Sequence, residues 1–257
     1  MPVRRHELAG ASRLLSEGVH EPAMERTAKA TPHVISVIVP VYNETGTMHE
    51  LLARLREAPF RKEIIVVDDC STDGTGGILA GERDIVLVRH DRNRGKGAAI
   101  RTGIARVSGD IVIIQDADLE YDPNEIPKVV APIIEGAADI SYGSRFKRGL
   151  PREMALPNKI ANLILAWTVR VLYGYPLSDE ATCYKAFRAS VLKSMKLKCE
   201  RFEFCPEVTA KALRAGRRIV EIELINYRPR TQKKGKKIRW TDGVEAVFTL
   251  VRYRFGS

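Results

Sequence analysis

Short apolar runs alternate with segments of helical periodicity through the first half of the chain. The runs are VISVIVPV from Val34, EIIVVD from Glu63, DIVLV from Asp84 and GDIVII from Gly109. Apolar residues recur at helical spacing between them, for example across residues 47–56. Continuous Val and Ile runs that alternate with helices are typical of a parallel sheet whose two faces are both covered. The pattern therefore predicts a single α/β domain with a mostly parallel, Rossmann-like sheet.

Each of these runs ends in polar, acidic or Gly-rich residues, and the carboxyl ends of parallel strands are where such sheets bind ligands. The first run is followed by Tyr42 and Glu44, whose ring and carboxylate suit a base or a ribose. The second is followed by DDCSTDGT, in which we interpret Asp69 as a ligand for a base N–H or a ribose hydroxyl. Asp73 in the same stretch is predicted to cap a helix. The loops after the runs are expected to converge on one crevice.

The segment NRGKGAAI after the third run is predicted to open a helix at Gly95 and Gly97. It does not match the dinucleotide-binding fingerprint, because Ile100 stands where the third glycine belongs, and it lacks the GK[ST] of a phosphate-binding loop. We interpret the glycines as allowing the backbone to approach a ligand closely, with Lys96 supplying positive charge. An NAD-dependent enzyme would need this segment to hold a pyrophosphate.

The fourth run stops on the sequence QDADLE, which places acidic side chains at Asp116, Asp118 and Glu120. Residues two apart on an extended strand end share one side, so these carboxylates repel one another. A divalent cation relieves that repulsion, and Mg²⁺ and Mn²⁺ prefer oxygen ligands. The alternative is an ordinary polar loop that caps a strand. We predict a Mg²⁺ or Mn²⁺ site that also holds a phosphorylated substrate, which argues against an NAD-dependent enzyme.

Composition limits what this site can belong to. The chain has 257 residues, of which 44% are hydrophobic, enough for one large domain, 33–257, after a polar and Ala-rich extension, 1–32. A short helix is predicted within the extension, around residues 7–17. The formal net charge of +10 favours anionic partners such as nucleic acid, phospholipid head groups or phosphorylated small molecules, and does not choose among them.

The cysteines and the hydropathy of the chain indicate the cellular compartment in which the protein is expected. The four cysteines form no CxxC pair, and a chain of this length needs no disulfide framework, so we expect reduced thiols and no zinc site in a cytoplasmic protein. No apolar stretch reaches the roughly 18 to 20 residues of a membrane span, and the N-terminal residues lack the apolar core of a signal peptide. Contact with a membrane would then be peripheral.

The stretch LPNKIANLILAWTVRVLYG carries an apolar stripe at helical spacing with one polar flank. The stripe consists of Ile160, Leu163, Ile164, Trp167, Val171 and Leu172. Such a stripe usually packs into a core, although an interfacial Trp beside basic charge also suits a helix that lies on a lipid surface. FEFCPEVTAKALRAGRRIVEIELINYRPR is predicted to form a helix and a strand that complete the sheet. The last segment, WTDGVEAVFTLVRYRF, is predicted to be an amphipathic helix with a basic end.

Several motifs, taken in order, resemble those of a known family. They are VPVYNE, DDCSTDGT, NRGKGAAI, QDADLEYDP, DISYGSRF, TCYKAFR and GKKI. The chain resembles the inverting glycosyltransferases of family 2 with the GT-A fold, and most closely the polyprenyl- or dolichyl-phosphate mannose synthase branch. The resemblance extends from Ile35 to Arg254, so it covers nearly everything but the N-terminal extension. It implies a GT-A fold and the use of a nucleotide sugar.

The resemblance also implies roles for individual residues. The base and ribose of the nucleotide sugar would be held by Pro40, Tyr42, Glu44, Val67 and Asp69, and its diphosphate by Asp116, Ala117 and Asp118. Lys96, singled out above for its charge, joins this nucleotide-sugar set. The metal would be held by Asp116, Asp118 and Glu120, where the family often has Gln in place of Glu120. Phosphate and acceptor contacts would come from Arg145, Arg230, Lys236 and Lys237. The last three belong to a basic loop that departs from the family pattern by placing lysines where an acidic residue often precedes GKK.

Two kinds of acceptor place different demands on this site. A hydroxyl acceptor needs a general base, whereas a phosphate is already anionic at neutral pH and needs basic residues to hold it. Asp179, in LSDEATCYK, is the candidate catalytic carboxylate on the acceptor side, alongside Asp118 at the metal, and Glu180 is the next choice. A helix N-cap is an equally good interpretation of Asp179. The basic residues favour the phosphate acceptor.

The sequence therefore predicts a metal-dependent, inverting hexosyltransferase. We expect the donor to be GDP-mannose, with UDP-glucose as the second candidate, and the acceptor to be a polyprenyl phosphate on the cytosolic face of a membrane. One alternative is the same fold acting on a soluble hydroxyl acceptor, which the missing membrane anchor favours. Another is a non-catalytic scaffold that binds anions through its +10 charge. No nucleic-acid partner is expected for the enzyme.

Overall fold

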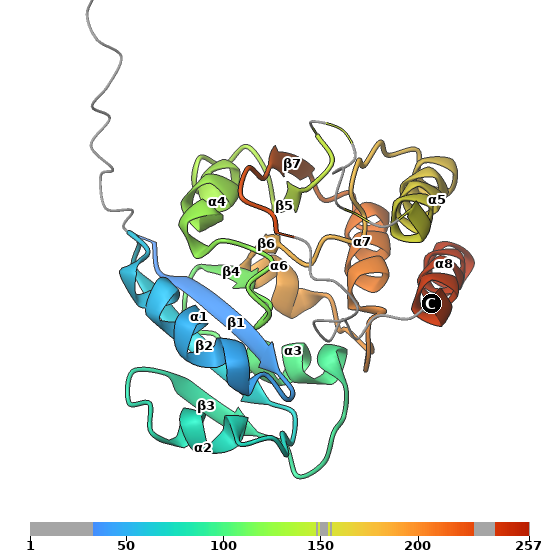
Figure 1. Ribbon diagram of the computed structural model, residues 1–257. Coiled ribbons are helices and arrows are strands. Elements are labelled where there is room, and N and C mark those ends of the chain that lie inside the picture. The colour runs from blue at the N-terminus through green and yellow to red at the C-terminus, as the bar shows by residue number, and fades with distance from the viewer. Residues whose placement is uncertain (1–32, 148, 150–153, 155, 229–239, 257) are drawn as a thin grey trace, which may run out of the picture.

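The computed structural model describes residues 33–147, 149, 154, 156–228 and 240–256, except for the side chain of Trp240. Its strands form one seven-stranded sheet in the order β3-β2-β1-β4-β6-β5-β7 (Figure 1). The strands are β1 (Ile35–Val41), β2 (Lys62–Asp68), β3 (Val86–Arg89), β4 (Ile111–Ile114), β5 (Ile140–Ser144), β6 (Lys185–Arg188) and β7 (Ile219–Glu223). Neighbouring strands are parallel except where β6 runs antiparallel to both β4 and β5. The predicted mostly parallel sheet is confirmed.

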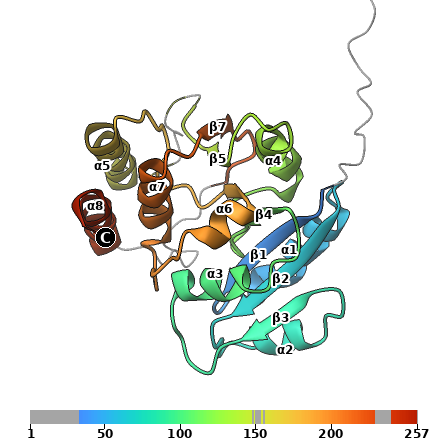
Figure 2. The same cartoon turned by 180° about the vertical axis from the view of Figure 1, so that it is seen from behind.

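Helices cover both faces of the sheet, as Figures 1 and 2 show from opposite sides. One face carries α1 (Thr45–Glu57), α2 (Thr75–Ala80), the short 3-10 helix η1 (Pro123–Glu125) and α4 (Ile126–Ile134). The other carries α3 (Lys96–Ile104), α5 (Leu156–Tyr173), α6 (Ala189–Ser194), α7 (Phe204–Arg214) and α8 (Trp240–Phe255). The helices α5, α7 and α8 pack against one another, so α5 and α8 form the outer edge of the molecule.

The strands read as continuous apolar runs because both of their faces are buried. In β1, Val37 and Val39 pack with α1, while Ile38 points to the opposite face and packs with α3. All three side chains are fully buried. The same alternation places Ile113 and Ile114 of β4 in the two different cores. The Val and Ile pattern therefore reports burial on two faces, which is the physical reason that the α/β prediction succeeds.

Asp73 fixes the starts of two helices, which confirms its predicted role as a cap. Its carboxylate accepts a hydrogen bond from the backbone N–H of Thr45 at 3.1 Å and from that of Thr75 at 3.0 Å. These are the first residues of α1 and α2, whose N–H groups have no partner within their own helices. The same hydrogen bonds hold the pKa of Asp73 well below its usual value, although partial burial opposes the shift. Asp73 therefore joins two strand-end loops to each other.

We expect Asp73→Ala to lower the free energy of unfolding by about 1–2 kcal/mol, because two helix starts lose their cap. The pKa of this carboxyl group is lower in the folded protein than in the unfolded chain. Its contribution to the free energy of unfolding is complete when the pH is above the pKa of the unfolded state, and it is lost as the pH falls towards the pKa of the folded state. The difference between wild type and Asp73→Ala in urea denaturation should therefore shrink between about pH 7 and about pH 3. Asp122→Ala, which removes the cap of η1 alone, is the matched control with the smaller loss. An undiminished difference at the lower pH would contradict this account.

Two further helix predictions have different outcomes. The helix that would begin in LSDEATCYK, if Asp179 were an N-cap, is absent, because the stretch forms turns and then enters β6. The helix predicted near residues 7–17 lies outside the described residues. Among the helices that the structure describes, none combines the length and apolar composition needed to cross a bilayer.

Candidate active site

The acidic loop after β4 meets the start of α3. The ammonium of Lys96, the first residue of α3, lies 2.6 Å from Oδ1 of Asp116. The hydroxyl of Thr47 on α1 donates to the carbonyl oxygen of Ala117 at 2.6 Å and holds the loop from the other face of the sheet. The structure thus brings together Lys96, Asp116 and Asp118, which the sequence assigned to the donor diphosphate.

The carboxylates of this loop are crowded. Burial, and then the neighbouring charges of Asp116 and Glu120, raise the pKa of Asp118 to about 7. Asp116 raises the pKa of Lys96 well above its ordinary value, although burial opposes the shift. Lys96 therefore neutralises Asp116, while Glu120 adds a second negative charge beside Asp118. Such a place favours a cation.

The predicted set of three metal ligands is only partly assembled. Glu120 donates its backbone N–H to Oδ1 of Asp118 at 3.2 Å, and its carboxylate accepts a hydrogen bond from Tyr227 at 3.3 Å. Within the described ranges, no three His, Cys, Asp or Glu side chains are grouped as a metal site. Mg²⁺ commonly uses one or two carboxylates and completes its shell with water and substrate phosphates. Asp116 and Asp118 fit that kind of site, and Glu120 is instead joined to Tyr227.

The residues predicted to hold the base and ribose lie together at the ends of β1 and β2. Pro40 of β1 pairs with Val67 of β2 in the sheet register, and the N–H of Asp69 donates to the carbonyl oxygen of Val41 at 2.8 Å. Tyr42 and Glu44 follow directly in the loop after β1, with Tyr42 half-buried and Glu44 buried. The residues predicted for the base and the ribose therefore lie close together at the carboxyl ends of β1 and β2.

Asp69 has a second role that the sequence did not show. Its carboxylate accepts hydrogen bonds from the His90 ring at 2.6 Å, from the Arg94 N–H at 2.8 Å and from the Gly95 N–H at 2.8 Å. His90 in turn contacts the hydroxyl of Thr102 on α3 at 2.9 Å. Asp69 thus anchors the loop that leads into α3, and any ligand would share its oxygens. A histidine two residues after the third apolar run, His90, was the available signal for this anchor.

The glycines of NRGKGAAI are explained by protein backbone. Gly95 has φ +92°, and a Cβ there would lie 2.3 Å from the carbonyl oxygen of Glu200. A Cβ on Gly97 would lie 2.9 Å from the carbonyl carbon of Cys199. A close approach to the backbone of the segment before α7 is therefore sufficient to explain both glycines. The predicted helix start at this position is confirmed.

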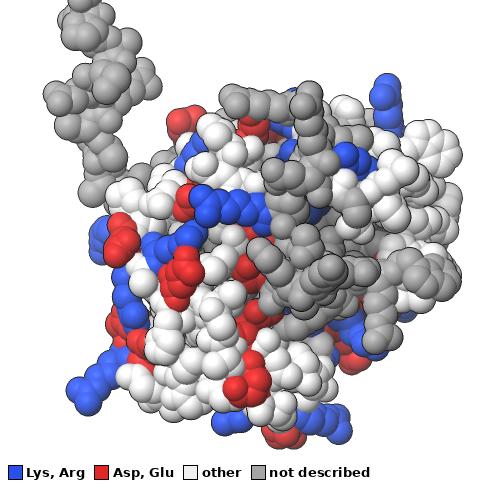
Figure 3. All heavy atoms as spheres, in the orientation of Figure 1, with Lys and Arg blue, Asp and Glu red and all other residues white. Residues whose placement is uncertain are grey.

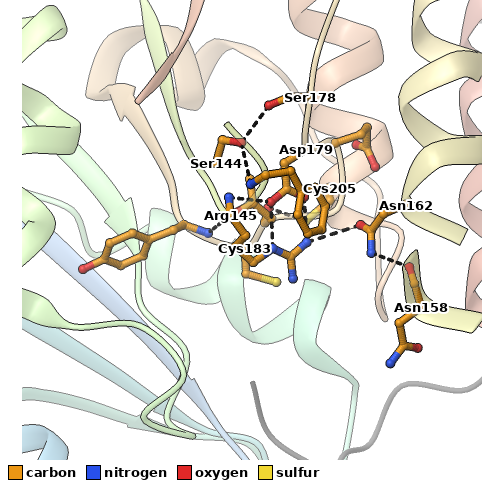
Figure 4. A network of polar contacts seen from close by, with 12 residues as sticks. Ser144, Arg145, Asn158, Asn162, Ser178, Asp179, Cys183 and Cys205 are labelled. Carbon is orange, nitrogen blue, oxygen red and sulfur yellow. Dashed lines mark hydrogen bonds and ion pairs between the residues drawn. The ribbon is translucent and has the colours of Figure 1, made fainter. Parts of the chain in front are cut away.

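Arg145 and Asp179 form a buried, two-point ion pair. The Asp179 carboxylate accepts from Arg145 Nε at 2.7 Å, from a terminal guanidinium nitrogen at 2.6 Å and from the Arg145 backbone N–H at 3.0 Å. Asp179 is fully buried. Figure 4 shows the Arg145 guanidinium held between Asp179 and Asn162 of α5, whose side-chain oxygen lies 3.3 Å away. Asp179 is therefore not a helix N-cap, and it fixes the direction of Arg145.

This arrangement leaves the acceptor side without an obvious base among the described carboxylates. Both oxygens of Asp179 are bonded to Arg145. Glu180, the second candidate, is fully buried, and its carboxylate accepts from the Thr209 hydroxyl at 3.2 Å. Burial raises the pKa of Glu180. Asp179 is thus placed to orient a cation, which is a different role from the catalytic one predicted for it.

Tyr227 connects the basic and acidic halves of the site. The Arg145 guanidinium lies 5.4 Å from the centre of its ring, and its hydroxyl donates to the carboxylate of Glu120. The side chain of Tyr227 thus lies between the Arg145 guanidinium, which follows β5, and the Glu120 carboxylate in the loop after β4. The other predicted phosphate contacts, Arg230, Lys236 and Lys237, lie outside the described residues.

Comparison with known proteins bears on this site. The model for "Glycosyl transferase family 2" matches residues 36–195, which include the β4 loop, Arg145 and Asp179. The chain is a family 2 glycosyltransferase. It is 30% identical over 215 residues to UDP-N-acetylglucosamine--dolichyl-phosphate N-acetylglucosaminyltransferase of Methanococcus voltae, covering 74% of this chain and 84% of that protein. It is 36% identical over 181 residues to undecaprenyl-phosphate 4-deoxy-4-formamido-L-arabinose transferase of Pseudomonas fluorescens. That match covers 67% of this chain and 52% of the relative, so it spans about half the relative's length.

Solved structures confirm the fold of this family 2 glycosyltransferase. Glucosyl-3-phosphoglycerate synthase from Mycobacterium tuberculosis, in complex with Mn²⁺, UDP and phosphoglyceric acid, matches with a TM-score of 0.66. The match covers 88% of this chain and 80% of that one at 20% identity. The GT-A architecture implied by the sequence motifs is therefore shown. A sequence identity of 20% does not allow the roles of individual residues to be transferred to this chain.

Proposed function

We propose that this family 2 glycosyltransferase transfers a sugar, with inversion, from a nucleotide diphosphate sugar to a polyprenyl phosphate. The observation that carries the proposal is the buried Arg145, which Asp179 orients and which Tyr227 links to the acidic β4 loop. An anionic acceptor needs a fixed cation and no general base, because its oxygen is already deprotonated at neutral pH. The site offers such a cation, while both oxygens of Asp179 are bonded to Arg145 and Glu180 is fully buried.

Asp116 and Asp118 would hold Mg²⁺ or Mn²⁺ together with the donor diphosphate. The bound ion would supply charge stabilisation for the leaving phosphate. Lys96, paired with Asp116, adds a second positive group at the same place. Arg145 would orient the acceptor phosphate towards the anomeric carbon, on the side opposite the leaving group. The strand-end residues around Tyr42 and Asp69 would hold the nucleoside.

For the donor we now favour a UDP sugar over GDP-mannose. The Methanococcus voltae relative is named for UDP-N-acetylglucosamine, and the mycobacterial structure contains UDP. The residues proposed to contact the base do not themselves distinguish uracil from guanine. For the acceptor, both the dolichyl-phosphate and the undecaprenyl-phosphate enzymes among the relatives use a polyprenyl phosphate. The relatives thus support the lipid acceptor more directly than they support any one sugar.

Exposed apolar side chains on α5 and α8 support contact with a lipid surface. They are Leu156, Ile160, Leu163, Ile164, Trp167, Val171, Val244, Phe248, Val251 and Phe255. Trp167 is 65% exposed and Phe248 is 64% exposed, so most of the stripe expected from the sequence is not core. In Figure 3 the right-hand surface, where Figure 1 places α5, is mostly free of charged side chains. Exposed Arg170 and Arg252 on the same helices suit anionic head groups.

The α5–α8 surface should therefore bind vesicles. We expect Trp167→Glu with Phe248→Glu to weaken co-sedimentation with phosphatidylglycerol vesicles at least tenfold, because each change places a charge where apolar area would be buried. Leu87→Glu is the matched control, since Leu87 is an exposed apolar residue on the distant edge strand β3. Turnover of a water-soluble, short-chain polyprenyl phosphate should be unchanged in all three proteins. Equal vesicle binding by the double variant and the control would refute the assignment.

The proposed function is tested by donor turnover. The purified protein would be given UDP-glucose, UDP-N-acetylglucosamine and GDP-mannose, each with Mg²⁺ or Mn²⁺, with and without a short-chain polyprenyl phosphate. We expect release of one nucleoside diphosphate only when metal and lipid phosphate are both present. Turnover with a soluble hydroxyl acceptor, and none with the lipid, would replace the proposed acceptor. No turnover of any donor, with retained binding of anions, would favour the non-catalytic scaffold.

A further inference from the structure

A basic cavity lies between the loop that leads into α3 and the segment before α7. Its volume is about 390 Å³, and its lining includes Arg92, Arg94, Arg101, Arg201 and Glu200. We call it the arginine cavity. Cavities that bind small molecules commonly measure about 300–1,000 Å³, so the arginine cavity has room for a small phosphorylated compound.

The backbone on both sides of the arginine cavity is held by hydrogen bonds. The N–H of Arg94 donates to the buried carboxylate of Asp69 at 2.8 Å. Gly97 of α3 donates its N–H to the carbonyl oxygen of Arg201 at 2.8 Å, which joins the two walls. The guanidinium of Arg101 donates to two carbonyl oxygens of the segment before α7, at 3.2 Å each. The arginines therefore extend from a framework that is already in place before any ligand binds.

The positive charges of the arginine cavity are not balanced by the protein. Within the described ranges, none of its four arginines forms an ion pair, with Glu200 or with any other carboxylate. Elsewhere on the surface, Arg56 donates to the carboxylate of Asp84 at 2.7 Å. Like charges that are grouped repel one another, and an anion bound among them relieves the repulsion. A phosphate suits this place because a guanidinium can donate two parallel hydrogen bonds to its oxygens.

Positive charge continues beyond the arginine cavity. A neighbouring cavity of about 200 Å³ shares Arg101 and is also lined by Lys193 and Lys196. It lies where α3 meets α6, two helices that are next to each other in both views of the fold (Figures 1 and 2). The ammonium of Lys193 donates to the carbonyl oxygen of Val107 at 2.8 Å, so its position is fixed as well. This concentration of cations favours a ligand with several negative charges over a single carboxylate.

We propose that the arginine cavity binds a multiply charged phosphate group, such as a diphosphate or a phosphomonoester, without a metal ion. The carboxylates of Asp116 and Asp118, which the proposed donor site uses, do not line it. The same phosphate chemistry occurs in soluble metabolites and in lipid head groups. The proposal stands apart from the proposed sugar transfer, because none of the four arginines has a part in that reaction.

The test uses the full chain in EDTA and measures binding of inorganic pyrophosphate by calorimetry. Arg92→Gln with Arg201→Gln, the cavity variant, removes two exposed arginines of the cavity. Arg83→Gln with Arg217→Gln is the matched control, because it removes two exposed arginines that precede β3 and β7. Thermal unfolding checks that each protein is folded, and Arg94→Gln repeats the test with a single exposed change. Co-sedimentation with phosphatidylcholine vesicles that contain phosphatidic acid tests the lipid source.

We expect wild type and the control to bind pyrophosphate and the cavity variant to bind it at least about tenfold more weakly, because charge-assisted hydrogen bonds are lost. If pyrophosphate does not bind, but the cavity variant binds the vesicles at least about tenfold more weakly than the control, the phosphate belongs to a lipid head group. Equal binding of both probes by the cavity variant and the control overturns the proposal. Absence of binding of either probe to wild type also overturns it. Failure of donor turnover would reject the proposed function and leave this result unaffected.

Discussion

Replacing Asp118 with Asn is expected to lower kcat for sugar transfer by about 100- to 1,000-fold. Asp118 stands at the end of β4 in a place where acidic side chains are concentrated and where Lys96 pairs with the neighbouring Asp116 instead. Asparagine keeps the shape and removes the negative charge that would hold Mg²⁺ or Mn²⁺ against the leaving diphosphate. Steady-state turnover of the donor with lipid phosphate, at several metal concentrations, measures the effect.

The Asp118→Asn variant should fold normally, since asparagine preserves the volume of the side chain and relieves the repulsion between neighbouring carboxylates. Glu135→Gln, an exposed carboxylate at the end of α4, is the matched control and should leave turnover unchanged. Calorimetry should show that adding metal increases the affinity for UDP less in Asp118→Asn than in wild type or Glu135→Gln. If Asp118→Asn retains wild-type kcat at saturating Mn²⁺, the carboxylate has no role in metal-assisted departure of the nucleotide.

Asp179→Ala is expected to lower the free energy of unfolding by about 3–5 kcal/mol, because it leaves the buried guanidinium of Arg145 without its partner. Transfer to the lipid phosphate should also fall sharply, since Arg145 loses the carboxylate that fixes its direction. Urea denaturation and donor turnover measure the two effects. A general base would behave differently, because its removal lowers kcat without a large loss of stability.

The double variant Arg145→Met with Asp179→Leu separates the two roles. Replacing both members of a buried ion pair with apolar residues of similar volume is often neutral for stability, so the fold should recover. Transfer to the polyprenyl phosphate should not recover, because no cation remains at that position to hold the acceptor. Recovery of both stability and turnover would show that the pair is structural only. The comparison therefore tests the acceptor proposal independently of the metal site.

The strands and the residues at their ends are the features that could best be predicted from the sequence. Val37, Ile38 and Val39 form one apolar run because neighbouring positions face two different helical layers, and that run predicts a covered parallel strand. Placing Lys96 near Asp116 also followed from the rule that strand ends share one edge of the sheet. The bond from Asp73 to the start of α2 was predictable because it is local in sequence, whereas its bond to Thr45 of α1 joins distant parts of the chain.

Other features depended on contacts between distant parts of the chain. Asp179 was equally well explained as a cap or as a catalytic group until the fold brought Arg145 from β5 against both of its oxygens. Gly95 suggested a ligand nearby, but the neighbour that excludes a side chain is the backbone of Glu200, more than a hundred positions along the chain. The apolar stripe of α5 gave no sign of which face would be exposed, since burial is decided by the packing of α7 and α8.

The sequence by itself determined the alternation of strands and helices, the edge at which the polar loops gather and the family to which the motifs belong. These properties follow from periodicity and from residues near one another in the chain. Only the tertiary structure decided that Asp179 orients Arg145, that Asp69 anchors the loop into α3 and that Tyr227 bonds to Glu120. Each of these depends on a pairwise contact between separate elements, and a local pattern of residues carries no information on which side chains will meet across the fold.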